Sequence, residues 1–408
     1  MRLQPFRAVR PAPEMAAEVA AVPYDVVSRA EAAELARGNP RSFLHVGRSD
    51  IDLPDDTDPH DPRVYAGARE ALDRLLREGV LAQDHEPSLF LYRLVMGDQV
   101  QTGLVGCVHV DDYDTNVILK HEKTRPDKED DRTRHVLTLN AHAEPVILTY
   151  RGRPEIDRLT AQVTRQDPVY DFTADDGVRH TVWRVMDTHP WTQHFGTIPV
   201  SYVADGHHRC ASASRAAKER REANSGHHGG EEYNWFLAVL FPSDQLRILP
   251  YNRLVRDLNG QTSAEVLARL AEVGELSETS QPEPPGPGSV CVFLDGKWHR
   301  LTFDLATIDN ADVIGSLDVS LLQNRVLTPI LGVGDPRTDP RIEFVGGIRG
   351  SAELERRVNS GDHAIGFSMH PTSLDQLLAV SDAGEVMPPK STWFEPKLRS
   401  GLFVHLLE

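Results

Sequence analysis

The sequence is poor in cysteine, and its three cysteines, Cys107, Cys210 and Cys291, are isolated from one another. None lies in a C-x-x-C pair, so the pattern predicts neither a disulfide framework nor a zinc site. Isolated cysteines of this kind fit a reducing compartment. We therefore expect a cytoplasmic protein.

Long apolar runs are also lacking. No window approaches about 18 consecutive apolar residues, so we expect no membrane span and no membrane partner. Near the N-terminus, Arg2, Arg7 and Arg10 flank only short apolar runs, which is unlike a signal peptide.

An excess of positive charge is missing as well, because the chain carries a net charge of −17. A nucleic-acid-binding face has to neutralise phosphates with lysine and arginine, and no basic helix-turn-helix pattern is evident. The composition therefore argues against nucleic acid as a partner.

Common nucleotide-binding and hydrolase signatures are absent too. The sequence has no G-x-x-x-x-G-K-[ST], no G-x-G-x-x-G after a strand, and no G-x-S-x-G. The glycine-rich stretch 346–350 (GGIRG) has the wrong spacing for a dinucleotide fingerprint. These absences exclude a P-loop kinase and an α/β-hydrolase.

Local signals for helices and strands alternate along the chain. Ser28 and Thr262 each begin a capping box, Gly97-Asp98 is typical of a hairpin turn, and Pro126 is placed to start a helix. The pattern predicts an α+β fold, a mixed α/β architecture.

The length of 408 residues, with 40% hydrophobic and 26% charged residues, is that of an ordinary globular protein with more than one domain. We predict two associated α/β lobes. Residues 1–223 form the first, and residues 233–408 form the second, with a tail that packs back on the core. The polar loop 224–232 (NSGHHGGEE) lies between them.

The most informative stretch is DGHHR, Asp205 to Arg209, which follows an apolar run and precedes a helical pattern. A helix N-terminus binds anions through unpaired N–H groups, and Gly206 lets the backbone approach a ligand closely. His207, His208 and Arg209 suit a phosphate, and Asp205 adds a base or a metal ligand. The alternative is that Asp205 only caps the helix and that the histidines are ordinary surface residues.

A second polar cluster, KHEKT, begins with Lys120 at the end of another apolar strand. His121-Glu122 supplies a base or a metal ligand, and Lys120 with Thr124 supplies phosphate contacts. The alternative is a solvated helix face, because the charges that follow pair at i,i+4 spacing. Neither polar cluster alone supplies both a metal anchor and enough positive charge. We therefore predict that the two converge on one pocket.

A third group lies near the C-terminus, where Lys390 and Lys397 flank Trp393-Phe394. One interpretation has both lysines closing over the phosphate site. The other is a tail whose aromatic side chains pack on the core.

The strand–DGHHR–helix arrangement resembles the phosphate-binding signature of the ParB/sulfiredoxin-like superfamily, in the form seen in its free-serine kinases. Most of the chain also resembles a bacterial domain-of-unknown-function family (DUF ten-fifteen). The segments that carry the second resemblance run nearly from end to end: 5–11 (PFRAVRP), 22–26 (VPYDV), 39–46 (NPRSFLHV), 120–124 (KHEKT), 249–253 (LPYNR), 335–339 (DPRTD) and 387–397 (MPPKSTWFEPK).

The resemblance implies a ParB/sulfiredoxin-like phosphate-binding core elaborated by further α/β segments. It also implies a kinase that transfers a phosphoryl group from pyrophosphate to free L-serine, with Ser42 and His45 in the acceptor pocket. Phosphoryl transfer needs charge neutralisation, usually with Mg²⁺, and a base near the acceptor hydroxyl. We assign Asp205, Glu122 and His207 to catalysis, Asp205 and Glu122 to Mg²⁺, and Gly206, His208, Arg209, Lys120, Thr124 and Lys390 to phosphate binding.

Other functions stay open at this point. One is a nucleotide-binding switch of the ParB kind, using CTP or ATP, although the sequence has no DNA-binding element for it. Another is a phosphatase acting on a small phosphorylated hydroxy acid. The expected partners are small molecules, namely L-serine with pyrophosphate or a nucleotide, and a homodimer is left open.

Overall fold

The computed structural model describes residues 1–309 and 311–408. The chain divides into two compact units, of which the first comprises Met1–Leu246 with Pro396–Glu408 and the second comprises Arg247–Glu395. Each unit mixes helices with more than one sheet, so the predicted mixed α/β class is confirmed. No helix in the described ranges is both long and apolar enough to cross a membrane.

These units differ from the predicted lobes 1–223 and 233–408. Strand β12 (Trp235–Pro242) lies inside the sheet of the first unit, where it pairs with β8 on one side and β5 on the other. The loop 224–232 is therefore a connection within one unit. The chain leaves the first unit only after β12, and its last residues return to that unit.

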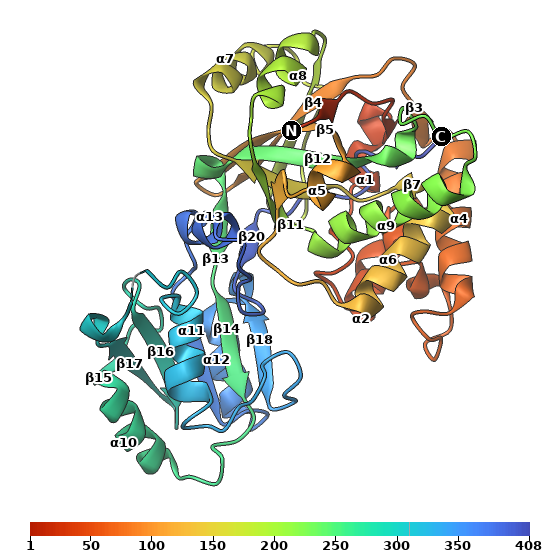
Figure 1. The fold of residues 1–408 in the computed structure, drawn as a ribbon. Helices are drawn as coiled ribbons and strands as arrows, with labels where there is room; N and C mark the ends of the chain where they lie inside the picture. The colour runs from red at the N-terminus through yellow and green to blue at the C-terminus, as the bar shows by residue number, and fades with distance from the viewer. Residues whose placement is uncertain (310) are drawn as a thin grey trace. The chain divides into compact units, whose positions relative to one another are not determined.

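The first unit is built on a nine-stranded sheet with mixed strand directions (Figure 1). In spatial order its strands are β6 (Ile118–Leu119), β11 (Ser201–Asp205), β8 (Val146–Tyr150), β12, β5 (Gln99–His109), β4 (Leu89–Met96), β10 (Arg179–Val185) and β9 (Tyr170–Thr173), and β1 (Leu3–Gln4) also pairs with β5. The unit also contains two separate two-stranded sheets. One pairs β2 (Val9–Pro11) with β3 (Leu81–Gln83), and the other pairs β7 (Ala141–His142) with β21 (His405–Leu406).

The helices of the first unit begin and end largely where local chemistry predicts. They are α1 (Ala16–Val19), α2 (Arg29–Ala36), α3 (Leu44–Gly47), α4 (Pro62–Arg77), α5 (Val110–Asp114), α6 (Pro126–Leu139), α7 (Pro154–Val163), α8 (His189–Gly196) and α9 (His207–Ala223). Both halves of the Ser28 capping box form, Pro126 is the first residue of α6, and Asn140 ends α6 with a φ of 52°.

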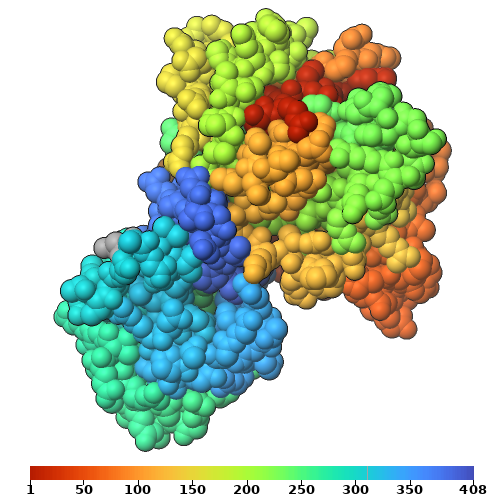
Figure 2. Space-filling view, viewed as in Figure 1, coloured from red at the N-terminus to blue at the C-terminus, as the bar shows by residue number. Residues whose placement is uncertain are grey.

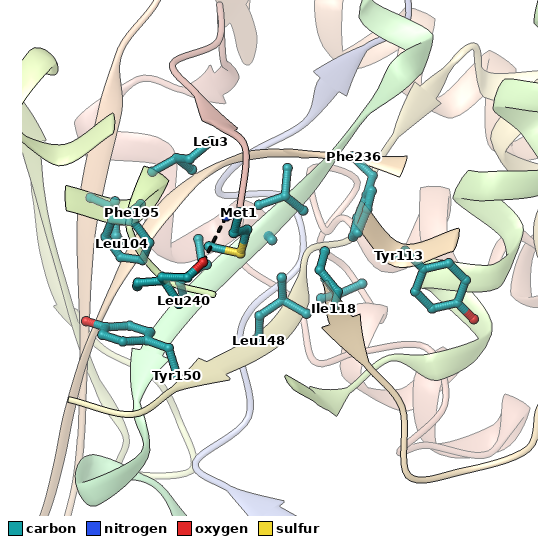
Figure 3. Packing of buried hydrophobic residues seen from close by; sticks show 14 of the residues in the cluster. Met1, Leu3, Leu104, Tyr113, Ile118, Leu148, Tyr150, Phe195, Phe236 and Leu240 are labelled. Atoms are coloured by element: carbon teal, nitrogen blue, oxygen red, sulfur yellow. Dashed lines mark hydrogen bonds between the residues drawn. The ribbon is translucent and has the colours of Figure 1, made fainter. Parts of the chain in front are cut away.

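Apolar side chains of α7, α8 and α9 pack with those of the sheet in one core, part of which is drawn in Figure 3. Helix α9 contributes small side chains, among them Ala211, Ala213 and Ala217. Small residues let the helix lie close to the strands, which fixes the position of its N-terminal end. On the face drawn in Figure 2, the surface of α5 (orange) borders that of α9 (green), and the two helices are in contact.

The second unit has an antiparallel six-stranded sheet. Its order is β15 (Gly274–Thr279), β17 (Lys297–Phe303), β16 (Ser289–Leu294), β19 (Ile365–Met369), β14 (Tyr251–Val255) and β18 (Ile342–Gly346), and β13 (Arg247–Leu249) pairs with β20 (Trp393–Glu395). Its helices are α10 (Ser263–Val273), α11 (Asp318–Leu322), α12 (Gly350–Asn359) and α13 (Leu374–Asp382). The predicted capping box at Thr262 forms at the start of α10.

Candidate functional site: an anion-binding helix terminus

The DGHHR stretch forms the junction between β11 and α9. Gly206 is the N-cap of α9 with a φ of 98°, and no described side chain caps this helix. A Cβ on Gly206 would lie 3.0 Å from Nε of Arg209 and 3.1 Å from Cγ1 of Val146, so a side chain here would be both strained and crowded. The helix therefore starts in a tight turn whose N-cap residue supplies no side-chain acceptor for the first N–H groups.

Asp205 ends β11 and is an ion-pair partner, so the structure corrects the idea that it only caps the helix. Its Oδ2 lies 3.2 Å from Nη2 of Arg209 and 3.6 Å from Nζ of Lys397. Burial alone would raise the pKa of Asp205, but the charges of Lys397, Arg209 and His207 outweigh it and lower the pKa to about 2. Asp205 is therefore ionised at neutral pH and is a weak base.

Arg209 is buried and largely engaged within the protein. Its Nη1 donates to the carbonyl oxygen of Pro145, and its Nη2 donates to Asp205. Its Nε–H is buried and has no hydrogen-bond partner among the described residues. The guanidinium group that we expected to bind phosphate therefore binds protein groups at the β11–α9 junction.

The two polar clusters of the sequence lie side by side. Strand β6 runs parallel to β11, with Leu119 opposite Tyr202, so the residues that follow the two strands leave the same edge of the sheet. The backbone N–H of Arg125 donates to Nε2 of His208 at 3.1 Å. Nδ1 of His207 lies 3.7 Å from Oε2 of Glu122. These contacts bring residues of the two clusters close to one another.

Two histidines form the buried centre of this contact. The rings of His121 and His207 meet edge to face, with centroids 4.4 Å apart. Burial lowers the pKa of His207 to about 3, although Asp205 opposes this, and burial likewise holds the pKa of His121 well below its usual range. Both imidazoles are neutral at physiological pH, so they offer hydrogen bonds to an anion without positive charge. Nε2 of His207 is buried and has no partner among the described residues.

Lys120 and Thr124, two other residues of the second cluster, contact other side chains of the protein. Nζ of Lys120 lies 4.0 Å from the centroid of the Tyr113 ring, and burial lowers the pKa of this lysine. The hydroxyl of Thr124 donates to Glu129 on the first turn of α6. Lys120 stabilises the fold through an aromatic contact, and Thr124 does so through its bond to α6.

Three predicted site residues make other contacts. Ser42 is buried, and its Oγ accepts a hydrogen bond from the N–H of Leu44. Nδ1 of His45 lies 2.8 Å from Asp52, and this hydrogen bond raises the pKa of His45. Lys390 belongs to the second unit, where its Nζ lies 5.4 Å from the centroid of the Tyr251 ring. No contact of Ser42 or His45 with the α9 junction is seen within the described ranges.

Sequence reasoning missed three residues near Arg209, namely Glu144, Arg132 and Tyr24. Glu144, Arg132 and Arg209 line a small cavity of about 20 Å³, which has room for about one water. Arg132 pairs with Asp131, from Nε to Oδ2 at 2.8 Å, and its guanidinium carbon lies 4.1 Å from the centroid of the Tyr24 ring. Tyr24 stands in the segment VPYDV, which the resemblance had singled out, whereas no local pattern marks Glu144.

Glu144 is the buried carboxyl with the most unusual setting. Burial raises its pKa to about 7, although the nearby charges of Arg209 and Arg132 oppose the change. Its Oε1 accepts a hydrogen bond from Oγ of Ser400 at 3.5 Å, and a Cβ on Gly47 would lie 3.0 Å from this oxygen. A carboxyl that titrates near neutral pH beside Arg209 belongs to the electrostatics of the site.

The carboxylates of Asp205 and Glu122 are compatible with Mg²⁺ only if substrate phosphates supply further ligands to the ion. In the described residues, no three histidine, cysteine, aspartate or glutamate side chains are grouped to hold a metal ion. Mg²⁺ usually needs only one or two protein carboxylates, because waters and phosphate oxygens complete its coordination. Asp205 and Glu122 fit that role, since both lie beside His207.

Fold and geometry define a mixed α/β protein with a candidate anion site at a strand-to-helix junction. Residues 3–320 match the family described as "Protein of unknown function (DUF1015)", and the chain belongs to that family. No curated protein matches the chain.

Solved structures give distant matches. A conserved hypothetical protein from Pyrococcus furiosus is 15% identical, with 74% of this chain and 94% of that chain covered and a TM-score of 0.36. A free serine kinase in complex with AMP is 14% identical, with 73% and 90% covered and a TM-score of 0.37. SbnI with a C-terminal truncation, from Staphylococcus aureus, is 13% identical, with 74% and 87% covered and a TM-score of 0.39. Similarity this low carries no inference about activity.

Proposed function

We propose that the protein is a small-molecule kinase that transfers a phosphoryl group from pyrophosphate to the hydroxyl of free L-serine, giving O-phosphoserine and phosphate. Its core would be of the ParB/sulfiredoxin-like, phosphate-binding kind. The observation that carries the proposal is the uncapped N-terminus of α9, which starts directly after Asp205 and lies beside Glu122 and two neutral histidines.

The donor phosphate would lie at the N-terminal N–H groups of α9, where the backbone supplies donors and the positive end of the helix dipole. The unpartnered Nε2 of His207 offers a further hydrogen bond. Mg²⁺ held by Asp205 and Glu122 would neutralise the charge on the phosphates.

Glu122 is the better candidate for the base that accepts the serine proton. The side chain of Glu122 is 41% exposed and can reach a substrate, whereas Asp205 is tied to Arg209 and Lys397 and has a pKa of about 2. A general base works best when its pKa is close to the working pH, so Asp205 suits metal and cation binding instead.

The test is turnover. Purified protein is incubated with Mg²⁺ and L-serine and, separately, with pyrophosphate, ATP or CTP, and phosphoserine is followed by phosphorus NMR. We expect phosphoserine with pyrophosphate. Product with ATP alone would correct the donor, nucleotide binding without product would favour a switch, and phosphate release from added phosphoserine would favour a phosphatase.

A pair of variants ties the activity to the site. Asp205→Asn should remove most of the turnover, since the anchor for Mg²⁺ loses its charge. Asp304→Asn is the matched control, because Asp304 is a true cap in the second unit and accepts from the N–H of Ala306 at 3.0 Å. Equal turnover of the two variants would remove Asp205 from the mechanism.

A further inference from the structure

The C-terminal tail, residues 396–408, is part of the first unit and is fixed there at several points. The carbonyl of Pro396 accepts from Nε2 of Gln101 at 3.2 Å, and the N–H of Arg399 donates to the Tyr92 hydroxyl at 3.3 Å. Arg399 also pairs with Asp176. Further along, the tail makes paired backbone bonds between Ser400 and Ala21 and between Val404 and Val9, and His405 pairs with Glu232.

Lys397 therefore stands between two anchored residues. Its side chain is only 12% exposed, and its Nζ lies 3.6 Å from Oδ2 of Asp205. The anchored backbone on either side fixes where this ammonium group can reach. The anchored tail therefore places the positive charge of Lys397 beside the start of α9.

Two other cations near the junction, Arg209 and Lys120, contact protein groups. Both terminal nitrogens of Arg209 donate to Pro145 and Asp205, and Lys120 lies against the ring of Tyr113. Lys397 shares Oδ2 of Asp205 with Arg209, so Asp205 keeps a cationic partner if Lys397 turns to another anion.

We propose that Lys397 is a phosphate-binding residue of the α9 junction, which exchanges its contact with Asp205 for an oxygen of the bound phosphate. This rests on the proposed function for the identity of the donor, but the binding role applies to any phosphate at this helix terminus. An ammonium group is a compact charge with three N–H donors. A phosphate carries more negative charge than one carboxylate, so the ammonium group forms strong charged hydrogen bonds with it. The alternative is a structural ion pair that fixes the tail.

The test is direct binding measured by calorimetry with three probes in the presence of Mg²⁺: pyrophosphate, inorganic phosphate and ADP. Lys397→Met should weaken the tightest-binding probe by about tenfold or more, because a charged hydrogen bond to phosphate is lost. Lys397→Arg should retain most of the affinity. Lys297→Met is the matched control, because Lys297 forms an exposed ion pair with Glu278 in the second unit and should not affect binding.

Hydrogen exchange of the tail amides separates binding from structure. We expect unchanged protection of the N–H groups of Ser400 and Val404 in Lys397→Met. The proposal is overturned if this variant binds every probe as the wild type does, if its weaker binding comes with loss of tail protection, or if the wild type binds none of the probes. Tight binding of ADP alone, with loss in Lys397→Met, would keep Lys397 as a phosphate ligand while overturning pyrophosphate as the donor.

Discussion

Replacing Glu144 by glutamine should make the protein more stable at alkaline pH, which is the opposite of the usual effect of a core substitution. The pKa of Glu144 rises from 4.5 to about 7 on folding, chiefly because the carboxyl is buried. A group with a raised pKa contributes fully to stability below its unfolded pKa, and this contribution is lost as the pH rises through the folded pKa. The wild-type protein therefore loses stability between about pH 4.5 and pH 7.

The size of the loss follows from the shift. A change from 4.5 to about 7 corresponds to about 3 kcal/mol once the group is ionised. Glutamine has nearly the same shape as the protonated acid and does not titrate. Glu144→Gln should thus match the wild type at or below about pH 4 and exceed its stability by up to about 3 kcal/mol at about pH 8.

The measurement is hydrogen exchange of the β12 amides, because a chain with two units need not unfold in one step. The amides of Val239 and Leu240 lie in the middle of the sheet and report on the opening of the first unit. The quantity compared is the difference between variant and wild type at each pH, which cancels the titration of all other groups.

A matched control has the opposite sign. Hydrogen bonding to Arg356 lowers the pKa of Glu353, so Glu353→Gln should be slightly destabilising at neutral pH. Glu353 lies in the second unit, so this control is read on the amides of β19. If the stability difference for Glu144→Gln does not change with pH, the carboxyl of Glu144 is not perturbed by burial. If the variant is the less stable protein at about pH 8, Glu144 is instead an ionised partner of Arg132 and Arg209, and the reasoning fails.

Four further outcomes are expected at the α9 junction. Asp205→Asn should lower turnover by about 10²–10⁴-fold. It should also lower the thermal midpoint, because Arg209 and Lys397 lose the negative charge that they pair with. An unchanged midpoint would contradict these ion pairs. Folding lowers the pKa of Asp205 to about 2. The stability that this carboxylate contributes is therefore complete above its unfolded pKa and is lost as the pH falls towards 2. Acid unfolding of the wild type compared with Asp205→Asn measures this loss. Arg209→Lys should raise the KM for the phosphate donor and lower the melting temperature, because one ammonium cannot bond both Pro145 and Asp205; two unchanged values would remove Arg209 from both roles. An excess of chelator should abolish turnover and Mg²⁺ should restore it, while full activity in chelator would show that no divalent ion is used.

Much of the local structure could be predicted from the sequence, because it depends on neighbours in the chain. The capping boxes at Ser28 and Thr262 follow from side chains that satisfy the first N–H groups, and the start of α6 at Pro126 follows from the fixed φ of proline. The span of α9 follows from Gly206 and the alanine-rich stretch after it. The DGHHR junction was predicted for the same reason. A glycine between an apolar strand and a helix rich in alanine marks a tight turn with exposed amides.

Only the tertiary structure decided what surrounds that junction. β12 joined the first unit through long-range pairing with β5 and β8, which no local signal in residues 224–242 could announce. One of the two cations beside Asp205 is Lys397, far along the chain, because the tail returns to the first unit and is anchored there. Burial turned His207 into a neutral donor and made Glu144 a carboxyl that titrates near pH 7. Sequence fixes which groups can ionise, whereas their charge depends on desolvation and on neighbours that only folding brings together.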